Sequence, residues 1–102
     1  INPPNLSIVV VDNEAYGETG WQQSHTGRGV DIAGMGAAAA IPNTRTVRDK
    51  AGLPEAATLL RSTNGTTLIV LKVAQTNPKS LRRPQDQIWN KNRFREALLG
   101  RI

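Results

Sequence analysis

Three consecutive residues with side-chain oxygen atoms, Asp12, Asn13 and Glu14, follow directly on an apolar run. Carboxylate and amide oxygens are hard ligands, which suit Mg²⁺ or Ca²⁺ better than Zn²⁺. The later acidic positions of an EF-hand loop are missing, so the residues do not form that motif. Asp12 and Glu14 are expected to point to opposite sides of the chain, which argues against an acid–base pair. The alternative is a turn at the end of a strand, where Asp and Asn are common.

Two other places carry residues that could do chemistry. His25 could act as a general base, but no carboxylate in the local sequence would orient it. A hydrogen-bonded loop histidine is the alternative. Residues 27–29 (GRG) resemble an anion-binding turn in front of a helix, although they match neither the dinucleotide-binding glycine motif nor the P-loop.

The composition excludes several classes of protein. A chain of 102 residues allows one domain. Without cysteine and with one histidine, the chain cannot form a disulfide framework, a thiolate zinc site, a cysteine nucleophile or a two-histidine site. No apolar run approaches the roughly 20 residues of a membrane span. The start shows neither a secretory signal pattern nor an initiating Met, so we expect a cytoplasmic piece of a longer protein.

The charge is unevenly distributed along the chain. The net charge is +5 overall, with four acids and one base in residues 1–40 but twelve bases and four acids in residues 41–102. A basic half can indicate a nucleic-acid partner or an anionic surface. The aromatic residues that would support nucleic-acid binding are nearly absent from it, so a solvated surface is the favoured interpretation.

The apolar runs predict the elements that position these residues. Residues 6–11 (LSIVVV) and 67–73 (TLIVLKV) are rich in β-branched residues, which is typical of parallel strands buried on both faces. The other predicted elements are a short strand at 43–47, helices at 32–40, 54–61 and 91–99, an irregular loop at 15–30 and a polar connector at 75–88. Asp31 and Gly100 are expected to cap helices. This alternation predicts an α/β fold with a parallel sheet, whose strand ends bind ligands.

The stretch IVVVDNEAYGETGWQQSHTGRGVDIA, residues 8–33, resembles the cofactor-binding domain of thiamine-diphosphate-dependent enzymes. In that family the cofactor motif begins with Gly-Asp-Gly and ends in a strand followed by two polar residues, usually Asn-Asn. Asp12-Asn13 matches this pair. The segments YGETG, QQSHTG, TRTVRD, TLIVLKV and FREALLG resemble the branch that contains the sulfopyruvate and phosphonopyruvate decarboxylases.

The resemblance implies a three-layer fold, a parallel sheet with helices on both faces. Residues 1–102 would form its second half, a partial cofactor domain that lacks the Gly-Asp-Gly half. The implied activity is decarboxylation of a 2-oxo acid with thiamine diphosphate and Mg²⁺. The implied partners are the rest of the cofactor domain and a pyrimidine-binding domain or subunit, in a homo- or hetero-oligomer. A small departure is Ala40, where relatives often have Gly.

The resemblance also implies roles for individual residues. Asn13 would give Mg²⁺ its side-chain carbonyl, Ala15 would give its main-chain carbonyl, and Asp12 would orient the turn rather than bind metal. The residues expected at the cofactor are Asp12, Asn13, Tyr16, Gly17, Glu18 and Thr19. Glu18 and His25 are the candidates for a catalytic role, and a structural role in the loop stays open for both.

Two functions from other classes remain beside the enzyme. One is a catalytically inactive module with the same fold that serves as a subunit or an interaction surface. The other is a basic nucleic-acid-binding domain that uses residues 79–101, which we consider unlikely. A steep loss of DNA affinity with salt would support the latter.

Overall fold

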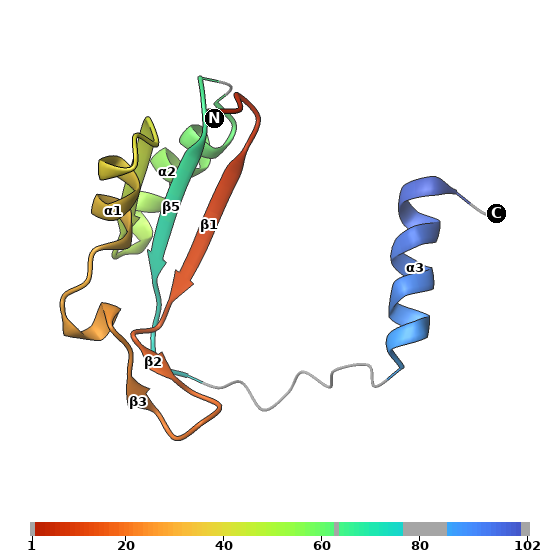
Figure 1. Ribbon diagram of the computed structural model, residues 1–102, viewed down its shortest axis with the longest axis horizontal. Helices are drawn as coiled ribbons and strands as arrows, with labels where there is room; N and C mark the ends of the chain where they lie inside the picture. Colours follow the sequence, from red (N-terminus) through yellow and green to blue (C-terminus); the bar gives the residue numbers. More distant parts are fainter. Residues whose placement is uncertain (1, 63, 77–85, 101–102) are drawn as a thin grey trace.

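A three-stranded parallel sheet forms the centre of the computed structural model, which describes residues 2–62, 64–76 and 86–100. Its strands are β1 (Ser7–Asp12), β5 (Thr67–Lys72) and β4 (Asn43–Val47), in that spatial order. Figure 1 shows β1 and β5 side by side and running in the same direction. The predicted α/β fold with a parallel sheet is therefore confirmed.

The helices α1 (Ile32–Ala38) and α2 (Leu53–Leu60) pack on opposite faces of the central strand. A Cβ atom added to Gly36 of α1 would lie 2.5 Å from the Leu68 side chain, so α1 closely approaches this face of β5. The next residue, Ile69, is fully buried against Val47 and Ala56 of α2. Because successive side chains of a strand point to opposite faces, β5 is covered on both sides.

The prediction that residues 6–11 are buried on both faces is wrong. β1 is the edge of the described sheet, and Val9 and Val11 are 45% and 68% exposed. Val9 lies beside Ile69 in the register, and the Ser7 hydroxyl donates to the Leu60 carbonyl of α2. These side chains therefore share the α2 face of the sheet, but α2 packs mainly on β4 and β5. Within the described sheet, the predicted double burial is found in β5 and not in β1.

The prediction of an irregular loop over residues 15–30 is only partly correct. The segment contains a short antiparallel hairpin, β2 (Ala15–Tyr16) and β3 (Gln22–Gln23), followed by a single 3₁₀ turn, η1 (Thr26–Arg28). Two backbone hydrogen bonds flank the hairpin, from Ser24 N–H to the Glu14 carbonyl at 2.9 Å and from Trp21 N–H to the Tyr16 carbonyl at 3.0 Å. Residues 15–30 thus contain regular secondary structure and extend from the end of β1.

The boundaries of the two packed helices differ slightly from the predictions. α1 ends at Ala38 rather than residue 40, because Ala40 adopts a left-handed conformation with φ 64°. Glycine adopts this conformation most easily. Asp31 occupies the N-cap position of α1, but its side chain makes no capping hydrogen bond. α2 begins at Leu53 with a proline in its first turn, after a 3₁₀ turn, η2 (Lys50–Gly52).

The helix α3 (Gln87–Leu99) begins four residues earlier than predicted, because the Asp86 side chain accepts a hydrogen bond from Trp89 N–H. Gly100 ends it, as predicted, with φ 75°. Figure 1 shows α3 away from the sheet, and none of its residues is buried. Most of the predicted connector at 75–88 lies outside the described residues. No helix in the described ranges has the length and apolarity to cross a membrane.

Candidate functional site

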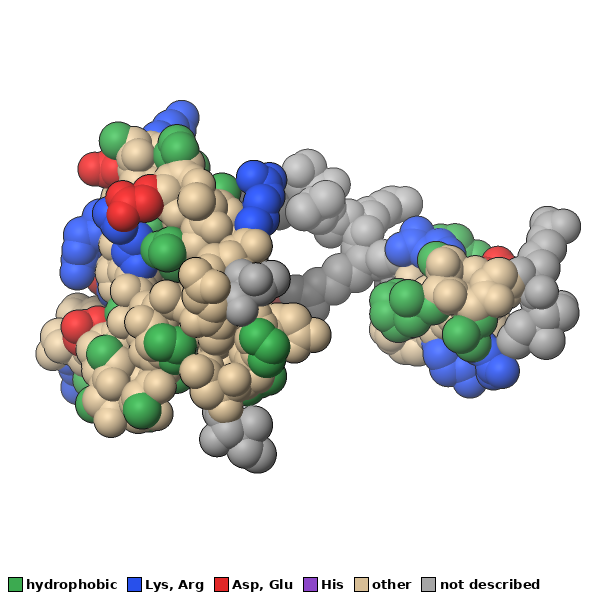
Figure 2. Space-filling view, turned by 90° about the horizontal axis from the view of Figure 1, so that it is seen from above, with side chains coloured by type: hydrophobic (Ala, Val, Ile, Leu, Met, Phe, Trp, Pro, Cys, Tyr) green, Lys and Arg blue, Asp and Glu red, His purple; other side chains and the backbone are tan. Residues whose placement is uncertain are grey.

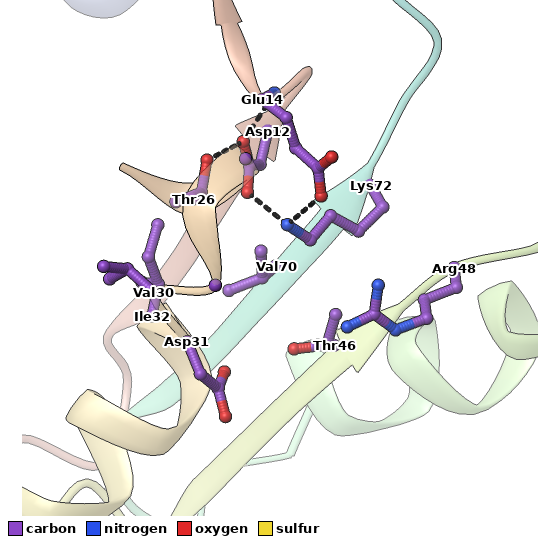
Figure 3. Close-up of a pocket in the computed structure, with 12 residues that line it drawn as sticks. Asp12, Glu14, Thr26, Val30, Asp31, Ile32, Thr46, Arg48, Val70 and Lys72 are labelled. Carbon is purple, nitrogen blue, oxygen red and sulfur yellow. Dashed lines mark hydrogen bonds and ion pairs between the residues drawn. The ribbon is translucent and has the colours of Figure 1, made fainter. Parts of the chain in front are cut away.

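The polar residues of three chain segments meet at the carboxyl edge of the sheet. Asp12 ends β1, Lys72 ends β5, and Arg48 follows β4 by one residue. They border a cavity of about 300 Å³ that is lined by Asp12, Glu14, Thr26, Gly27, Gly29, Val30, Asp31, Ile32, Thr46, Arg48, Val70 and Lys72. Figure 3 shows Asp12, Glu14 and Lys72 gathered on one side of this cavity. The structure therefore places the predicted polar cluster at the strand ends, where α/β sheets bind ligands.

The ammonium group of Lys72 joins the two carboxylates of the cluster. Its Nζ atom lies 2.7 Å from Asp12 Oδ2 and 2.6 Å from Glu14 Oε1 (Figure 3). The prediction that the two carboxylates point to opposite sides is wrong. β1 ends at Asp12, Glu14 has a left-handed backbone with φ 61°, and both carboxylates meet at the Lys72 ammonium. The pair is bridged by a cation and does not form a free acid–base couple.

Both carboxylate oxygens of Asp12 accept hydrogen bonds, and the residue is only 7% exposed. Its Oδ1 atom accepts hydrogen bonds from the Glu14 N–H at 2.9 Å and from the Thr26 hydroxyl at 2.7 Å. Burial alone would raise the pKa of the Asp12 carboxyl, but the hydrogen bonds from Lys72, Thr26 and the Glu14 N–H outweigh it and lower the pKa. Asp12 is therefore a carboxylate that fixes the turn.

The same contacts act on Lys72 in the opposite direction. Hydrogen bonds to Asp12 and then to Glu14 raise the pKa of the Lys72 ammonium above its ordinary value. The Lys72 side chain is 16% exposed, and its position is set by the strand register, which places it directly beside Asp12. Lys72 is thus a permanent positive charge at the strand ends over the whole physiological pH range.

The predicted metal ligands, Asn13 and Ala15, lie in the turn between β1 and β2. Asn13 Oδ1 accepts a hydrogen bond from the Ala15 N–H at 3.1 Å, which leaves this amide oxygen with a further lone pair. The carbonyls on either side of Ala15, those of Glu14 and Tyr16, both accept hydrogen bonds from the β3 side of the hairpin. Consecutive carbonyls of an extended chain point in opposite directions, so the Ala15 carbonyl is directed away from β3. The turn therefore offers two neutral oxygen atoms.

Acidic and histidine side chains do not supply a complete metal site in the part of the chain that the structure describes. There, no group of three or more His, Cys, Asp or Glu residues could hold an ion. Neutral amide and carbonyl oxygens are acceptable Mg²⁺ ligands, but Mg²⁺ requires six oxygen atoms and usually takes several from water or from phosphate groups. The donor set fits a Mg²⁺ ion that is shared with a phosphate ligand.

The other predicted cofactor residues lie in the hairpin, beyond the strand ends. Tyr16 belongs to β2 and is 53% exposed. Gly17 lies under the Trp21 ring, since a Cβ atom at Gly17 would be 3.2 Å from it. The Thr19 hydroxyl donates to Gln22 Oε1 at 3.0 Å. Thr19 and Glu18 are exposed in the connection between the two strands. None of these four predicted residues lines the cavity.

His25, a candidate for a catalytic role, directly precedes η1 and is exposed. Its backbone carbonyl accepts the Arg28 and Val30 N–H groups at 3.0 and 3.2 Å. It does not line the cavity. Gly27, two residues further on, allows the backbone to pass close to Glu14, because a Cβ atom there would lie 2.8 Å from the Glu14 carbonyl.

Comparisons with known proteins support the resemblance seen in the sequence. The chain is 34% identical over 98 residues, 94% of its length, to a sulfopyruvate decarboxylase of Methanosarcina acetivorans. It is 47% identical over 32 residues to the sulfopyruvate decarboxylase subunit beta of Methanocaldococcus jannaschii. The chain is a distant homologue of sulfopyruvate decarboxylase. No family model matches it, and no solved structure is significantly similar.

The homology covers most of this chain but a small part of its relatives. The match spans 25% of the Methanosarcina sulfopyruvate decarboxylase and 17% of the Methanocaldococcus subunit. The homology is therefore to a part of a decarboxylase.

Lys72 and Thr26, which contact the Asp12 carboxylate from outside its own turn, were not among the predicted site residues. Lys72 carried a detectable signal, because it is the single charged residue in the apolar run TLIVLKV. In a parallel sheet, a charge at the end of a neighbouring strand lies at the same edge as Asp12. Thr26 carried no such signal, since the structure of the hairpin alone brings it back to β1.

Proposed function

We propose that this chain forms the second half of a thiamine-diphosphate and Mg²⁺ site in an enzyme that removes CO₂ from a 2-oxo acid of the sulfopyruvate or phosphonopyruvate type. The observation that carries the proposal is homology to sulfopyruvate decarboxylase over 94% of the chain. The position of Asp12 and Asn13 at the carboxyl edge of a parallel sheet agrees with it. When bound, the cofactor would supply the electron sink for loss of CO₂.

In this proposal Asn13 Oδ1 and the Ala15 carbonyl are the metal ligands that the chain contributes. They fit Mg²⁺ because both are hard, neutral oxygens two residues apart in a turn that hydrogen bonds hold in place. Asp12 is a positioning residue, since its carboxylate is fully engaged by Thr26, Lys72 and the backbone.

The hairpin lies beside this turn and would border the bound diphosphate and the substrate. Tyr16, Gly17, Glu18 and Thr19 are the residues we assign to this border. Glu18 and His25 are the candidates for handling a proton during the reaction. Both belong to exposed parts of the segment that extends from β1, where a substrate can reach them.

The rest of the site must come from outside the segment described. The chain spans a quarter of the length of the Methanosarcina relative, and the Methanocaldococcus relative is a subunit. We propose that a segment with Gly-Asp-Gly completes the cofactor domain, and that a pyrimidine-binding domain or subunit completes the active site in a cytoplasmic oligomer.

The alternative with most support is an inactive module of the same fold. Among the described residues, the ligands proposed for the metal are neutral oxygens, and no group of three or more acidic or histidine residues could hold it independently. Nucleic-acid binding has less support. Lys and Arg side chains lie on more than one side of α3 in Figure 2, and the Arg93 guanidinium lies 4.8 Å from the centre of the Trp89 ring.

The test is the cofactor dependence of Asn13→Ala in the complete protein that carries this chain. We expect it to need at least about ten times more Mg²⁺ and thiamine diphosphate for half-maximal CO₂ release from sulfopyruvate, because one inner-sphere oxygen is lost. Asn92→Ala on the exposed face of α3 is the matched control and should behave as the wild type. Wild-type cofactor dependence of Asn13→Ala would refute the assignment. A wild-type protein that binds the cofactor but releases no CO₂ from 2-oxo acids would support the inactive module.

A further inference from the structure

Lys72 occupies a place between two carboxylates that a divalent cation could also take. Its Nζ atom lies 2.7 Å from Asp12 Oδ2 and 2.6 Å from Glu14 Oε1. Two carboxylates that converge on one point are typical of cation sites in proteins. Here the charge that satisfies them belongs to a side chain and cannot be exchanged with solvent.

The register of the sheet fixes this arrangement. Asp12 and Lys72 are direct neighbours in β1 and β5, and the Val73 N–H donates to the Asp12 carbonyl at 3.0 Å. Thr26 holds the Asp12 carboxylate from the opposite side at 2.7 Å, and the Ser24 and Thr26 hydroxyls are hydrogen-bonded at 2.8 Å. The ammonium group therefore sits in a frame formed by a strand on one side and the hairpin segment on the other.

We propose that Lys72 is a positioning residue that acts as a built-in counter-ion for the turn. It takes the place of a divalent cation between Asp12 and Glu14, and it leaves the neutral oxygens of Asn13 and Ala15 as the ligands for the catalytic metal. The second part of this inference rests on the proposed function.

The physical reason is competition between two adjacent cation sites. Without Lys72, the carboxylates of Asp12 and Glu14 would face each other with no counter-ion, and Asp12 is only 7% exposed. A carboxylate that is shielded from water attracts a divalent cation more strongly than a neutral amide oxygen does. A cation bound there would draw Glu14 and the turn that follows it away from the geometry that Asn13 requires. Lys72 prevents this because its charge is always present.

The inference predicts a gain of metal binding when Lys72 is removed. In the 102-residue chain, Lys72→Met should bind Mg²⁺ or Ca²⁺ at least about ten times more tightly than the wild type, as measured by titration calorimetry. The matched control is Lys50→Met. It removes the same charge from an exposed position in η2, whereas the ion pairs of Asp12 and Glu14 are made by Lys72, and it should leave cation binding unchanged. The triple variant Asp12→Asn, Glu14→Gln, Lys72→Met should lose the new site.

The outcome is decisive even if Lys72→Met folds poorly. In that case, added Ca²⁺ should restore the circular dichroism of the folded chain, because the ion replaces the lost ammonium. The triple variant should fold without the ion and should not respond to it. Equal cation affinity of Lys72→Met and Lys50→Met, or a failure of Ca²⁺ to restore an unfolded Lys72→Met chain, would overturn the inference.

This experiment separates the inference from the proposed function. Cation binding to the chain does not depend on thiamine diphosphate or on decarboxylation, so it can succeed when the Asn13→Ala test fails. In the complete protein, Lys72→Met should raise the Mg²⁺ concentration for half-maximal activity, and Lys72→Arg should restore part of the dependence by keeping the charge. If Lys72→Met gains a cation site but the Mg²⁺ dependence of activity is unchanged, Lys72 is a counter-ion for the turn, and its proposed effect on the metal ligands Asn13 and Ala15 is refuted.

Discussion

The strands β1 and β5 have nearly the same composition and very different surroundings. Each is a six-residue strand that contains a run of branched apolar residues, and they are paired residue by residue along their whole length. Ile69 of β5 is completely buried, whereas its partner Val9 is 45% exposed. The difference comes from their neighbours, because β5 lies between two strands and under two helices, and β1 has one strand beside it in the described sheet.

The contrast is reversed at the ends of the same two strands. There β1 contributes Asp12, the most deeply buried charged residue in the part of the chain that the structure describes, while Val9 and Val11 of the same strand are exposed. The buried carboxylate is possible because β5 supplies Lys72 directly opposite. The edge strand is thus loosely packed along its length and tightly fixed at its functional end. Apolar content therefore favours strand formation in both β1 and β5, while the neighbouring elements decide how far each strand is buried.

The largest expected difference in stability between β5 and β1 comes from truncating the paired residues Ile69 and Val9. Ile69→Ala should reduce the free energy of unfolding by about 2–5 kcal/mol, because it leaves a cavity between β5 and α2. Val9→Ala should cost less than about 1 kcal/mol, since much of its side chain is already in water. Urea denaturation of the chain, followed by circular dichroism, measures both.

The milder substitution Ile69→Val keeps this comparison measurable if Ile69→Ala does not fold. It should cost about 0.5–1.5 kcal/mol. A cost for Val9→Ala equal to that for Ile69→Ala would mean that the α2 face of β1 is covered in solution.

The second test concerns the two acids at the end of β1. Asp12→Asn should destabilise the chain by about 1–3 kcal/mol, because it weakens a buried ion pair and a hydrogen-bonded network. Glu14→Gln should cost less than about 1 kcal/mol, since its side chain is 41% exposed and makes one ion pair. Equal effects of the two substitutions in thermal denaturation would contradict the deep placement of Asp12.

Much of the fold could be predicted from local patterns. The strand at 43–47 was predicted with its observed bounds, and the polar residues after the first strand were placed at the ligand-binding edge. The burial of β1 could not be predicted, because LSIVVV and TLIVLK are equally apolar and only the spatial order β1-β5-β4 distinguishes them. The hairpin was missed since its strands are two residues long and depend on a few backbone hydrogen bonds.

The site was predictable only in part, for the same physical reason. Asp12, Asn13 and Ala15 are consecutive or nearly so, and a motif can be recognised in them. The contacts that fix them come from Thr26 and Lys72, which are 14 and 60 residues away from Asp12. Such partners follow from the register of the sheet, and no local pattern contains that register. The sequence therefore predicts which residues can act, and the structure adds which residues hold them.

The smallest expected effect concerns Val11, the last apolar residue of β1. Val11 is 68% exposed and lies beside Leu71, which packs against the core cluster of Val47, Ala56 and Ile69. Val11→Thr keeps the β-branched shape and the strand propensity, so it should change the free energy of unfolding by less than about 0.5 kcal/mol. Leu71→Thr places a hydroxyl against the apolar cluster and should cost more than about 1 kcal/mol.

Thermal denaturation of these two variants, in the same buffer, measures the difference. If Val11→Thr destabilises as strongly as Leu71→Thr, the exposed face of β1 is packed against another surface in the folded chain. The burial of a strand in this sheet would then follow its apolar content after all. If only Leu71→Thr is costly, the two strands differ in burial because of their positions in the sheet and not because of their sequences. The geometry of the edge strand β1 is then fixed at its end by Asp12 and Lys72.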